Sequence, residues 1–360
     1  MSGGPELAAT PMRILVTGHE GYIGSVMAPL LAERGHDVVG LDIGYYRDCT
    51  LTPALADVPT IRKDIRDVEQ SDVQGFDAVI HLAALSNDPI GNLNEAWTAE
   101  INDQASLQLA TLAKRAGVPR FLFSSSCIMY GLTSDGEVVT EESPLDPQTE
   151  YARSKVRSER TIRALTDDSF SPTFLRNGTV YGLSPRMRFD TVFNNLTGSA
   201  FTSGEVVVRS DGQPWRPVVH VTDVARAFAA VLEAPREIVH GQAFNTGAAH
   251  LNHQVIALAR IAVETVPGSR LEVRAEADAD QRTYRTDFSK FARAFPDFEF
   301  LWSPRQGAQE LVSAFREVGL TAEDFADRRF TRLKWLRHLL NSGRLDTNLR
   351  WSDQQVEVTA

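Results

Sequence analysis

Residues 14–24, ILVTGHEGYIG, carry the strongest structural signal in the chain. Their apolar start predicts a buried parallel strand that ends at Thr17 and enters a turn with glycines at G-x-x-G-x-x-G spacing. A helix is expected to follow over 22–34. Glycines let the backbone approach a pyrophosphate closely, and the free N–H groups at the helix N-terminus favour that anion. The stretch therefore predicts a dinucleotide-binding turn, although a glycine turn can also serve tight packing alone.

A carboxylate supports this interpretation. A second apolar stretch, 38–41, ends at Asp42, where a dinucleotide-binding βαβ unit places the acid that holds the adenosine ribose. The charge of this acid repels a 2′-phosphate, so we expect NAD rather than NADP as cofactor. The nearby Arg47 weakens that preference.

Composition indicates a globular protein in a reducing compartment. The 360 residues are 42% hydrophobic and 23% charged, and the net charge of −10 disfavours nucleic acid as a partner. Cys49 and Cys127 are the only cysteines, so no disulfide framework is expected and the cytoplasm is favoured. Residues 1–12 lack a secretory apolar region and are expected to be a disordered leader. No run reaches membrane-spanning length, and no membrane partner is expected.

Alternating strand and helix patterns predict an α/β fold: a Rossmann-type, doubly wound parallel sheet with a smaller α+β substrate lobe. The sheet domain is expected over 13–182, with 218–246 returning to it, and the lobe over 183–217 and 247–327. Expected strands of the sheet are 13–17, 38–42, 78–82, 120–125, 173–176 and 244–246. Further strands are expected at 206–208 and 218–220. Expected helices are 22–34, 94–116, 149–165 and 222–233.

The segment 328–360 is predicted to be a basic amphipathic tail. Six Arg or Lys and no acid occur over 328–344, and Leu333, Leu336 and Leu339 give the segment one apolar helical face. Such a helix packs on its own domain or on a second subunit. The alternative is an anionic membrane surface or an acidic partner.

Three side chains predict acid–base chemistry. Tyr151 and Lys155 lie at i and i+4, one above the other on a helix face. A neighbouring ammonium and an oxidised nicotinamide both favour the phenolate, which would make Tyr151 an acid/base for a substrate hydroxyl. Ser126 ends a strand and can aim its hydroxyl at the same oxygen. The alternatives are a surface tyrosine beside a solvated lysine and a serine that only caps its strand.

Taken in order, these motifs resemble the extended short-chain dehydrogenase/reductase family, in its NAD-dependent sugar-nucleotide epimerase and dehydratase branch. The matching residues are Thr17-Gly18-x-x-Gly21-x-x-Gly24, Asp42, Asp64-Ile65, His81-Leu82-Ala83-Ala84, Asn102, Ser124-Ser125-Ser126, Tyr130-Gly131, Tyr151-x-x-x-Lys155, Tyr181-Gly182 and Arg216-x-x-x-His220-Val221-x-Asp223.

The resemblance implies roles by position. The implied catalytic residues are Ser126, Tyr151 and Lys155. The implied NAD-binding residues are Gly18, Gly21, Tyr22, Ile23, Gly24, Asp42, Asp64, Ile65, Leu82, Ala83, Ala84, Asn102, Ser124, Tyr151 and Lys155. The implied substrate-binding residues are Ser86, Ser126, Thr179, Asn195, Arg216 and Arg282, of which the last three suit a diphosphate but are equally typical of surface ion pairs. No metal is implied.

Departures from the family pattern narrow the reaction. Sugar-nucleotide 4,6-dehydratases resemble this chain but carry an Asp-Glu pair directly after the catalytic hydroxyl residue, where this chain has Cys127 and Ile128. Isoleucine cannot carry a proton, so dehydration is disfavoured. Cys127 is interpreted as structural, although related epimerases use a cysteine near this position. Thr179 and Pro217 also replace residues that are common in relatives.

The sequence therefore predicts epimerisation of a nucleotide-diphosphate sugar at C4, through a transient 4-keto sugar and with NAD kept bound. The alternatives are an NAD(P)H-dependent keto-sugar reductase, a 4,6-dehydratase, and an NAD-binding protein without catalysis. The resemblance also implies a homodimer.

Overall fold

The computed structural model describes residues 10–52, 56–133, 137–276 and 282–352. Within these ranges seven strands form one parallel sheet in the order β11-β7-β5-β4-β1-β2-β3. Their bounds are β1 Arg13–Thr17, β2 Asp37–Asp42, β3 Thr60–Arg62, β4 Ala78–His81, β5 Arg120–Ser126, β7 Ser171–Asn177 and β11 Ala243–Thr246. The predicted doubly wound parallel sheet is confirmed. Its order reverses between β1 and β4, where such sheets open a ligand crevice at their carboxyl ends.

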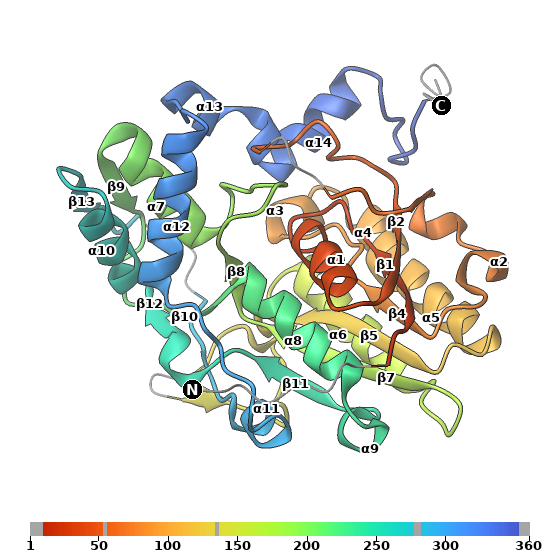
Figure 1. Ribbon diagram of the computed structural model, residues 1–360. Coiled ribbons are helices and arrows are strands. Elements are labelled where there is room, and N and C mark those ends of the chain that lie inside the picture. Colours follow the sequence, from red (N-terminus) through yellow and green to blue (C-terminus); the bar gives the residue numbers. More distant parts are fainter. Residues whose placement is uncertain (1–9, 53–55, 134–136, 277–281, 353–360) are drawn as a thin grey trace.

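Helices cover both faces of this sheet (Figure 1). On β1, Ile14 packs with α1 (Gly24–Glu33) and α8 (Val221–Glu233), whereas Leu15 faces the opposite layer, which contains α5 (Ala105–Arg115) and α6 (Glu150–Arg163). Successive strand residues point to opposite faces, so a doubly covered strand must be apolar throughout. The run at 14–16 meets that requirement, and its residues are fully buried.

The prediction of one continuous helix over 94–116 is wrong. It consists of α4 (Glu95–Thr98), a π-helical turn η2 (Ala99–Gln104) and α5. The extra residue of a π turn does not disturb the polar–apolar pattern enough to show in a sequence, and such turns concentrate at functional sites. Here the turn contains Asn102. The helix expected from residue 22 begins at Gly24, because 22 and 23 belong to the glycine turn.

A second sheet, in the order β12-β10-β8, lies beside the first. Its strands are β8 Thr179–Tyr181, β10 Trp215–His220 and β12 Asn252–Gln254. The strand expected at 218–220 therefore pairs with β8 and not with the main sheet, whereas the strand expected at 244–246 pairs with β7 in the main sheet.

The helices α7 (Val192–Ser203), α10 (Val255–Thr265) and α12 (Pro304–Glu317) form a separate core with these strands, at the left of Figure 1. Two further parallel pairs are β9 (Glu205–Val208) with β13 (Arg270–Val273) and β6 (Val138–Val139) with β14 (Arg285–Thr286). The remaining short elements are η1 Ile65–Asp67, α2 Gln70–Val73, α3 Asp88–Gly91, η3 Cys127–Tyr130, α9 Arg236–Val239, η4 Ala249–Leu251, α11 Ser289–Ala294, α13 Ala322–Ala326 and η5 Arg328–Phe330.

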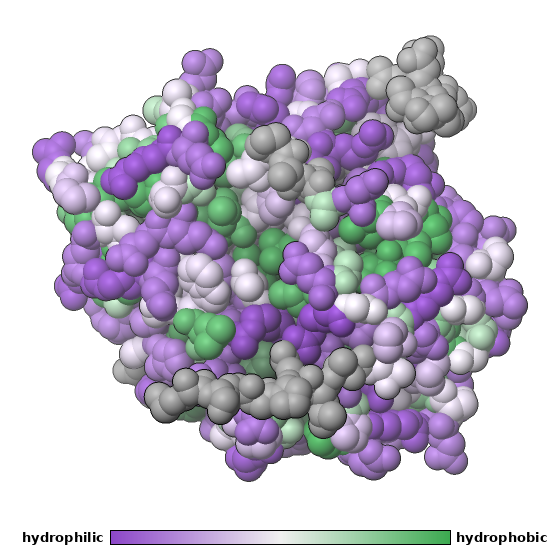
Figure 2. All heavy atoms as spheres, viewed as in Figure 1, coloured by the Kyte–Doolittle hydropathy of each residue, from purple (hydrophilic) through white to green (hydrophobic). Residues whose placement is uncertain are grey.

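The last helix, α14 (Arg332–Asn341), packs on the chain itself. Trp335, Leu336 and Leu339 are buried in the same core as β2 and α5, in agreement with the first of the two interpretations of its apolar face. Most of the expected leader, residues 1–9, and the end of the expected tail, residues 353–360, lie outside the described residues. Hydrophilic residues predominate on the face shown in Figure 2. No helix in the described ranges is both long and apolar enough to cross a membrane.

Candidate active site

A cavity of about 840 Å³ lies at the carboxyl ends of the central strands, between the main sheet and the smaller lobe. Of the residues that the sequence analysis selected, the structure brings all but two to its wall. These lining residues are Gly18, Gly21, Tyr22, Ile23, Gly24, Asp42, Asp64, Ile65, Leu82, Ala83, Ala84, Ser86, Ser124, Ser126, Tyr151, Thr179, Asn195, Arg216 and Arg282. The two exceptions, Asn102 and Lys155, are buried behind the wall.

The glycine turn leaves no room for side chains. Gly18 has a φ of +73°, and a Cβ built on it lies 2.7 Å from the backbone nitrogen of Ala83. A Cβ on Gly24 lies 2.3 Å from the carbonyl oxygen of Gly18. The N-terminus of α1 lies at the cavity wall and has no side-chain cap at Ile23, an arrangement that suits an anion such as a phosphate.

The carboxylate of Asp42 is oriented by two backbone amides. The N–H of Gly44 donates to Oδ1 at 2.8 Å and the N–H of Glu20 donates to Oδ2 at 3.1 Å. Burial raises the pKa of this carboxyl group, and the two amides oppose that effect. Arg47, which the sequence placed nearby, is not among the lining residues. The geometry therefore presents an acceptor to a ribose hydroxyl at the end of β2.

Tyr151 and Lys155 occupy successive turns of α6, which begins at the side-chain cap Thr149. The ammonium of Lys155 donates to the carbonyl oxygen of Ser124 at 2.8 Å and lies 5.9 Å from the ring centre of Tyr151. Ser126 ends β5 and faces the cavity, and its hydroxyl also accepts the N–H of Ile128 at 3.3 Å. Ser126 thus caps the turn η3 and also faces the cavity.

The pKa of Tyr151 shifts in the direction opposite to the one that the sequence predicted. Burial raises the pKa of Tyr151, and Asp88 raises it further, whereas Arg188 lowers it. Burial also lowers the pKa of Lys155 to about 7. Desolvation therefore outweighs the help that a lysine one turn away was expected to give the phenolate. These surroundings favour the neutral phenol of Tyr151, and a positive charge in the cavity would favour the phenolate.

Asn102 connects the cavity wall to α6. Its side-chain oxygen accepts the N–H of Leu85 at 2.7 Å, and its amide nitrogen donates to the carbonyl of Leu85 at 3.1 Å and to the hydroxyl of Ser154 at 3.2 Å. Ser154 lies between Tyr151 and Lys155 on α6. Asn102 is therefore a positioning residue that fixes the loop after β4 against the helix that carries the phenol.

The smaller lobe contributes arginines. Arg282 donates to Asp88 at 2.6 Å, and the hydroxyl of Thr149 donates to the same carboxylate at 2.5 Å. Arg216 on β10 donates to the carbonyl of Trp215 at 2.9 Å. Both arginines line the cavity, and Arg282 forms an ion pair with Asp88 there.

Sequence reasoning missed a second group of lining residues. Arg188 donates to Asp190 at 2.8 Å and to the hydroxyl and carbonyl of Ser86, both at 3.2 Å. Arg332, from α14, stacks over the ring of Tyr46 at 4.3 Å. The only sequence signal for Arg188 and Asp190 was the Arg-x-Arg-x-Asp pattern soon after Tyr181-Gly182. No sequence pattern showed that Arg332 reaches the cavity, because it lies far away along the chain.

Cys127 has no part in the cavity wall. Its thiol is fully buried and donates to the carbonyl of Arg176 at 3.1 Å, and burial raises its pKa to about 12. A neutral thiol pointing away from the cavity neither gives nor takes a proton there, so the geometry supports a structural role.

The cavity fits a dinucleotide. Three buried polar atoms of its lining residues form no hydrogen bond with any described residue: Oδ1 of Asn177, Oγ1 of Thr191 and Nη1 of Arg332. Buried polar atoms are normally paired, so they await a ligand with both donors and acceptors. The hydroxyls of a dinucleotide donate and accept and its phosphates accept, and the glycine turn and Asp42 lie in the same cavity wall. In the described ranges no three His, Cys, Asp or Glu side chains gather as metal ligands do.

Comparisons with known proteins point the same way. A family model described as NAD dependent epimerase/dehydratase family matches residues 14–247. A UDP-glucose 4-epimerase of Corynebacterium glutamicum is 30% identical over 66% of this chain and 75% of its own. UDP-glucuronic acid decarboxylase 4 of Arabidopsis thaliana is 26% identical over 85% of this chain and 69% of its own. The solved structure of MoeE5 with UDP-glucuronic acid and NAD is 26% identical, has a TM-score of 0.73 and covers 85% of this chain and 99% of its own.

Proposed function

Because the chain belongs to the NAD dependent epimerase/dehydratase family, we propose that it epimerises a nucleotide-diphosphate sugar at C4. The cofactor is NAD, and when bound it would supply the hydride chemistry that the reaction needs. Gly18, Gly21 and Gly24 would hold its pyrophosphate, and Asp42 its adenosine ribose.

The chain's own residues supply the proton chemistry. Tyr151 would take the proton of the C4 hydroxyl and give it back, with Ser126 donating a hydrogen bond to the same oxygen. Lys155 and Asn102 would act from behind the wall, the first through its charge and the second by fixing α6. Ser86, Thr179, Asn195, Arg216 and Arg282 would bind the nucleotide diphosphate and the sugar.

The observation that carries C4 epimerisation is the pair of side chains that follows Ser126. Ile128 faces the cavity and Cys127 points away from it, so neither removes a hydrogen from a sugar carbon or expels water. Three lining carboxylates, Asp88, Asp190 and Glu276, are ion-paired with Arg282, Arg188 and Arg209 respectively. Epimerisation at C4 needs only one acid/base at the hydroxyl, and Tyr151 provides it.

The experiment uses the purified protein with no added cofactor or reductant. It is incubated separately with UDP-glucose, UDP-galactose and UDP-glucuronic acid, and products are identified by proton NMR and mass spectrometry. Interconversion of a C4 pair at constant mass supports the proposal. Loss of water indicates a dehydratase, loss of CO₂ a decarboxylase, and turnover that requires NADH a reductase. Each of these three outcomes would overturn it.

We further propose that the protein is a cytoplasmic homodimer. Two buried, unpaired cysteines and the family resemblance support this. Light scattering coupled to gel filtration tests the dimer, and a mass of one chain at working concentration contradicts it.

A further inference from the structure

After α14 the chain folds back across the carboxyl ends of β2 and β3. We call residues 343–352 the C-terminal clasp. Trp351 in the clasp donates its indole N–H to the carbonyl of Ile43 at 2.8 Å, and the hydroxyl of Tyr45 donates to the carbonyl of Leu349. Ile43 and Tyr45 both line the cavity. The clasp is therefore hydrogen-bonded directly to residues of the cavity wall.

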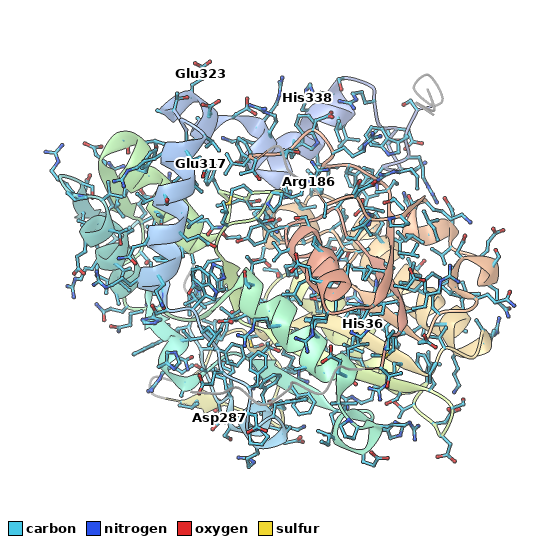
Figure 3. The ribbon with its side chains drawn as sticks, in the orientation of Figure 1. His36, Arg186, Asp287, Glu317, Glu323 and His338 are labelled. Carbon is cyan, nitrogen blue, oxygen red and sulfur yellow. The ribbon has the colours of Figure 1, made fainter. Side chains whose placement is uncertain are left out.

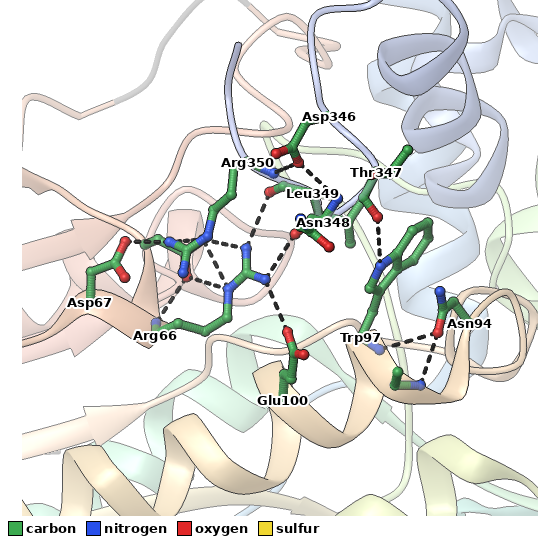
Figure 4. A network of polar contacts seen from close by, with 12 residues as sticks. Arg66, Asp67, Asn94, Trp97, Glu100, Asp346, Thr347, Asn348, Leu349 and Arg350 are labelled. Atoms are coloured by element: carbon green, nitrogen blue, oxygen red, sulfur yellow. Dashed lines mark hydrogen bonds and ion pairs between the residues drawn. The ribbon is translucent and has the colours of Figure 1, made fainter. Parts of the chain in front are cut away.

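A cluster of charges forms the second attachment (Figure 4). Arg350 forms ion pairs with Asp64, at 3.1 Å, and with Asp67. Arg66 donates to the carbonyls of Asn348 at 2.8 Å and Leu349 at 3.3 Å. Asp64 lines the cavity, so the same carboxylate belongs to the site and anchors the clasp.

The clasp has a defined internal structure. Asp346 accepts the backbone N–H groups of Asn348 at 2.8 Å and Arg350 at 2.7 Å. Leu349 has a φ of +56°, which is unfavourable for a residue with a side chain, yet its side chain is fully buried in the main core. The indole of Trp97 on α4 donates to the carbonyl of Thr347 at 3.0 Å. These contacts hold the clasp in one shape across the sheet edge.

The helix that leads into the clasp also reaches the cavity. Arg332 is 2% exposed, and its Nη2 donates to the carbonyl of Arg186 at 2.8 Å. Arg186 lies beneath α14, the helix that carries His338 (Figure 3). The other terminal nitrogen of Arg332, Nη1, is buried without a partner on a residue that lines the cavity. The C-terminal segment thus supplies both a wall and an unsatisfied cationic donor, and it lies beyond the stretch that the family model matches.

We propose that the clasp locks NAD into its site, so that release of the cofactor requires the clasp to detach. Asp42 marks the adenosine end of a dinucleotide site, and β3 is the neighbour of β2, so the clasp closes that end. This proposal rests on the proposed function in one respect: epimerisation is redox-neutral, so the enzyme can keep the same NAD molecule through many cycles. Loss of the charged contacts of Arg350 should therefore change how long NAD stays bound.

The test is the rate of NAD release, which needs no sugar. The full chain is loaded with NAD, passed rapidly through a desalting column, and the NAD remaining bound is measured by liquid chromatography over time. Arg350→Glu places a negative charge against Asp64 and Asp67. Its side chain is 36% exposed, so the fold should tolerate the change. Release should become at least about tenfold faster, the change that about 1.4 kcal/mol produces.

The matched control is Arg337→Glu, the same charge reversal at an exposed position of α14 that shows no ion pair to any described residue. Its release rate should stay within about twofold of the unmodified protein. Adding Asp67→Arg to Arg350→Glu should restore slow release in part. Unchanged release from Arg350→Glu, and also from Arg350→Glu combined with Trp351→Ala, overturns the proposal. Failure of sugar turnover in the unmodified protein would count against the proposed function and leave this result standing.

Discussion

The most informative substitution is Tyr151→Phe, because it removes one hydroxyl and little else. The phenol lines the cavity, and the structure shows no hydrogen bond between its hydroxyl and any described residue. The Cβ of Tyr151 lies against Gly91, where an added Cβ would come within 2.9 Å, and phenylalanine keeps that packing. The free energy of unfolding should therefore change by less than about 1 kcal/mol, since no satisfied hydrogen bond is lost.

The effect on turnover should be far larger. A positioned acid/base accelerates proton transfer by about 10²–10⁴-fold. At about 1.36 kcal/mol for each tenfold change, this corresponds to about 2.7–5.4 kcal/mol of transition-state stabilisation. Because the hydroxyl acts on the reacting oxygen, kcat should carry the loss, and KM and NAD retention should change only by a few-fold.

The assay is steady-state epimerisation followed by coupled oxidation of the product, with thermal unfolding measured on the same samples. Tyr46→Phe removes another tyrosine hydroxyl from the lining of the same cavity and serves as the control. Its kcat at saturating NAD should stay within a few-fold. A kcat for Tyr151→Phe within tenfold of the unmodified protein, at unchanged stability, would refute the role given to Tyr151.

Four further outcomes are expected. Asp42→Ala should lose NAD affinity and shift the NAD/NADP preference toward NADP by about tenfold or more, measured by calorimetry, since the repelling charge is gone. Gly18→Ala should abolish NAD retention and lower the unfolding temperature, because its Cβ would meet Ala83 at 2.7 Å at a φ of +73°. Burial lowers the pKa of Lys155 from 10.5 to about 7. The buried charge therefore lowers stability by its full amount below about pH 7, and by less as pH rises toward 10.5. Lys155→Met should raise the unfolding temperature of the NAD-free protein more at about pH 6 than at about pH 9.5. Cys127→Ala should keep kcat within a few-fold in the same assay, since the thiol points away from the cavity.

Local sequence patterns predicted the elements that carry the cofactor. The apolar run at 14–16 and the glycines after it have one consistent structural solution, because strand burial on two faces and a side-chain-free turn both restrict the residue types. Asp42 followed from its distance to that turn. These are short-range constraints, and the structure places the three glycines and Asp42 in the wall of one cavity.

Long-range contacts were not predictable in the same way. Arg332 reaches the cavity from the last helix, and its partner Arg186 is 146 residues away in the chain. The clasp contacts between Trp351 and Ile43 likewise span 308 residues. The raised pKa of Tyr151 also depends on Asp88 and on burial, neither of which shows in a Tyr-x-x-x-Lys spacing.

The central claim is that Tyr151 exchanges a hydroxyl proton and that no sugar carbon loses a proton to a base. The most direct test is to run the reaction in D₂O and locate deuterium in the product by NMR. We predict a C4 epimer with no deuterium on any sugar carbon, because Ile128 carries no base and the thiol of Cys127 is buried away from the cavity. Deuterium at C3 or C5 of the product, or a product that has lost water, would contradict the account.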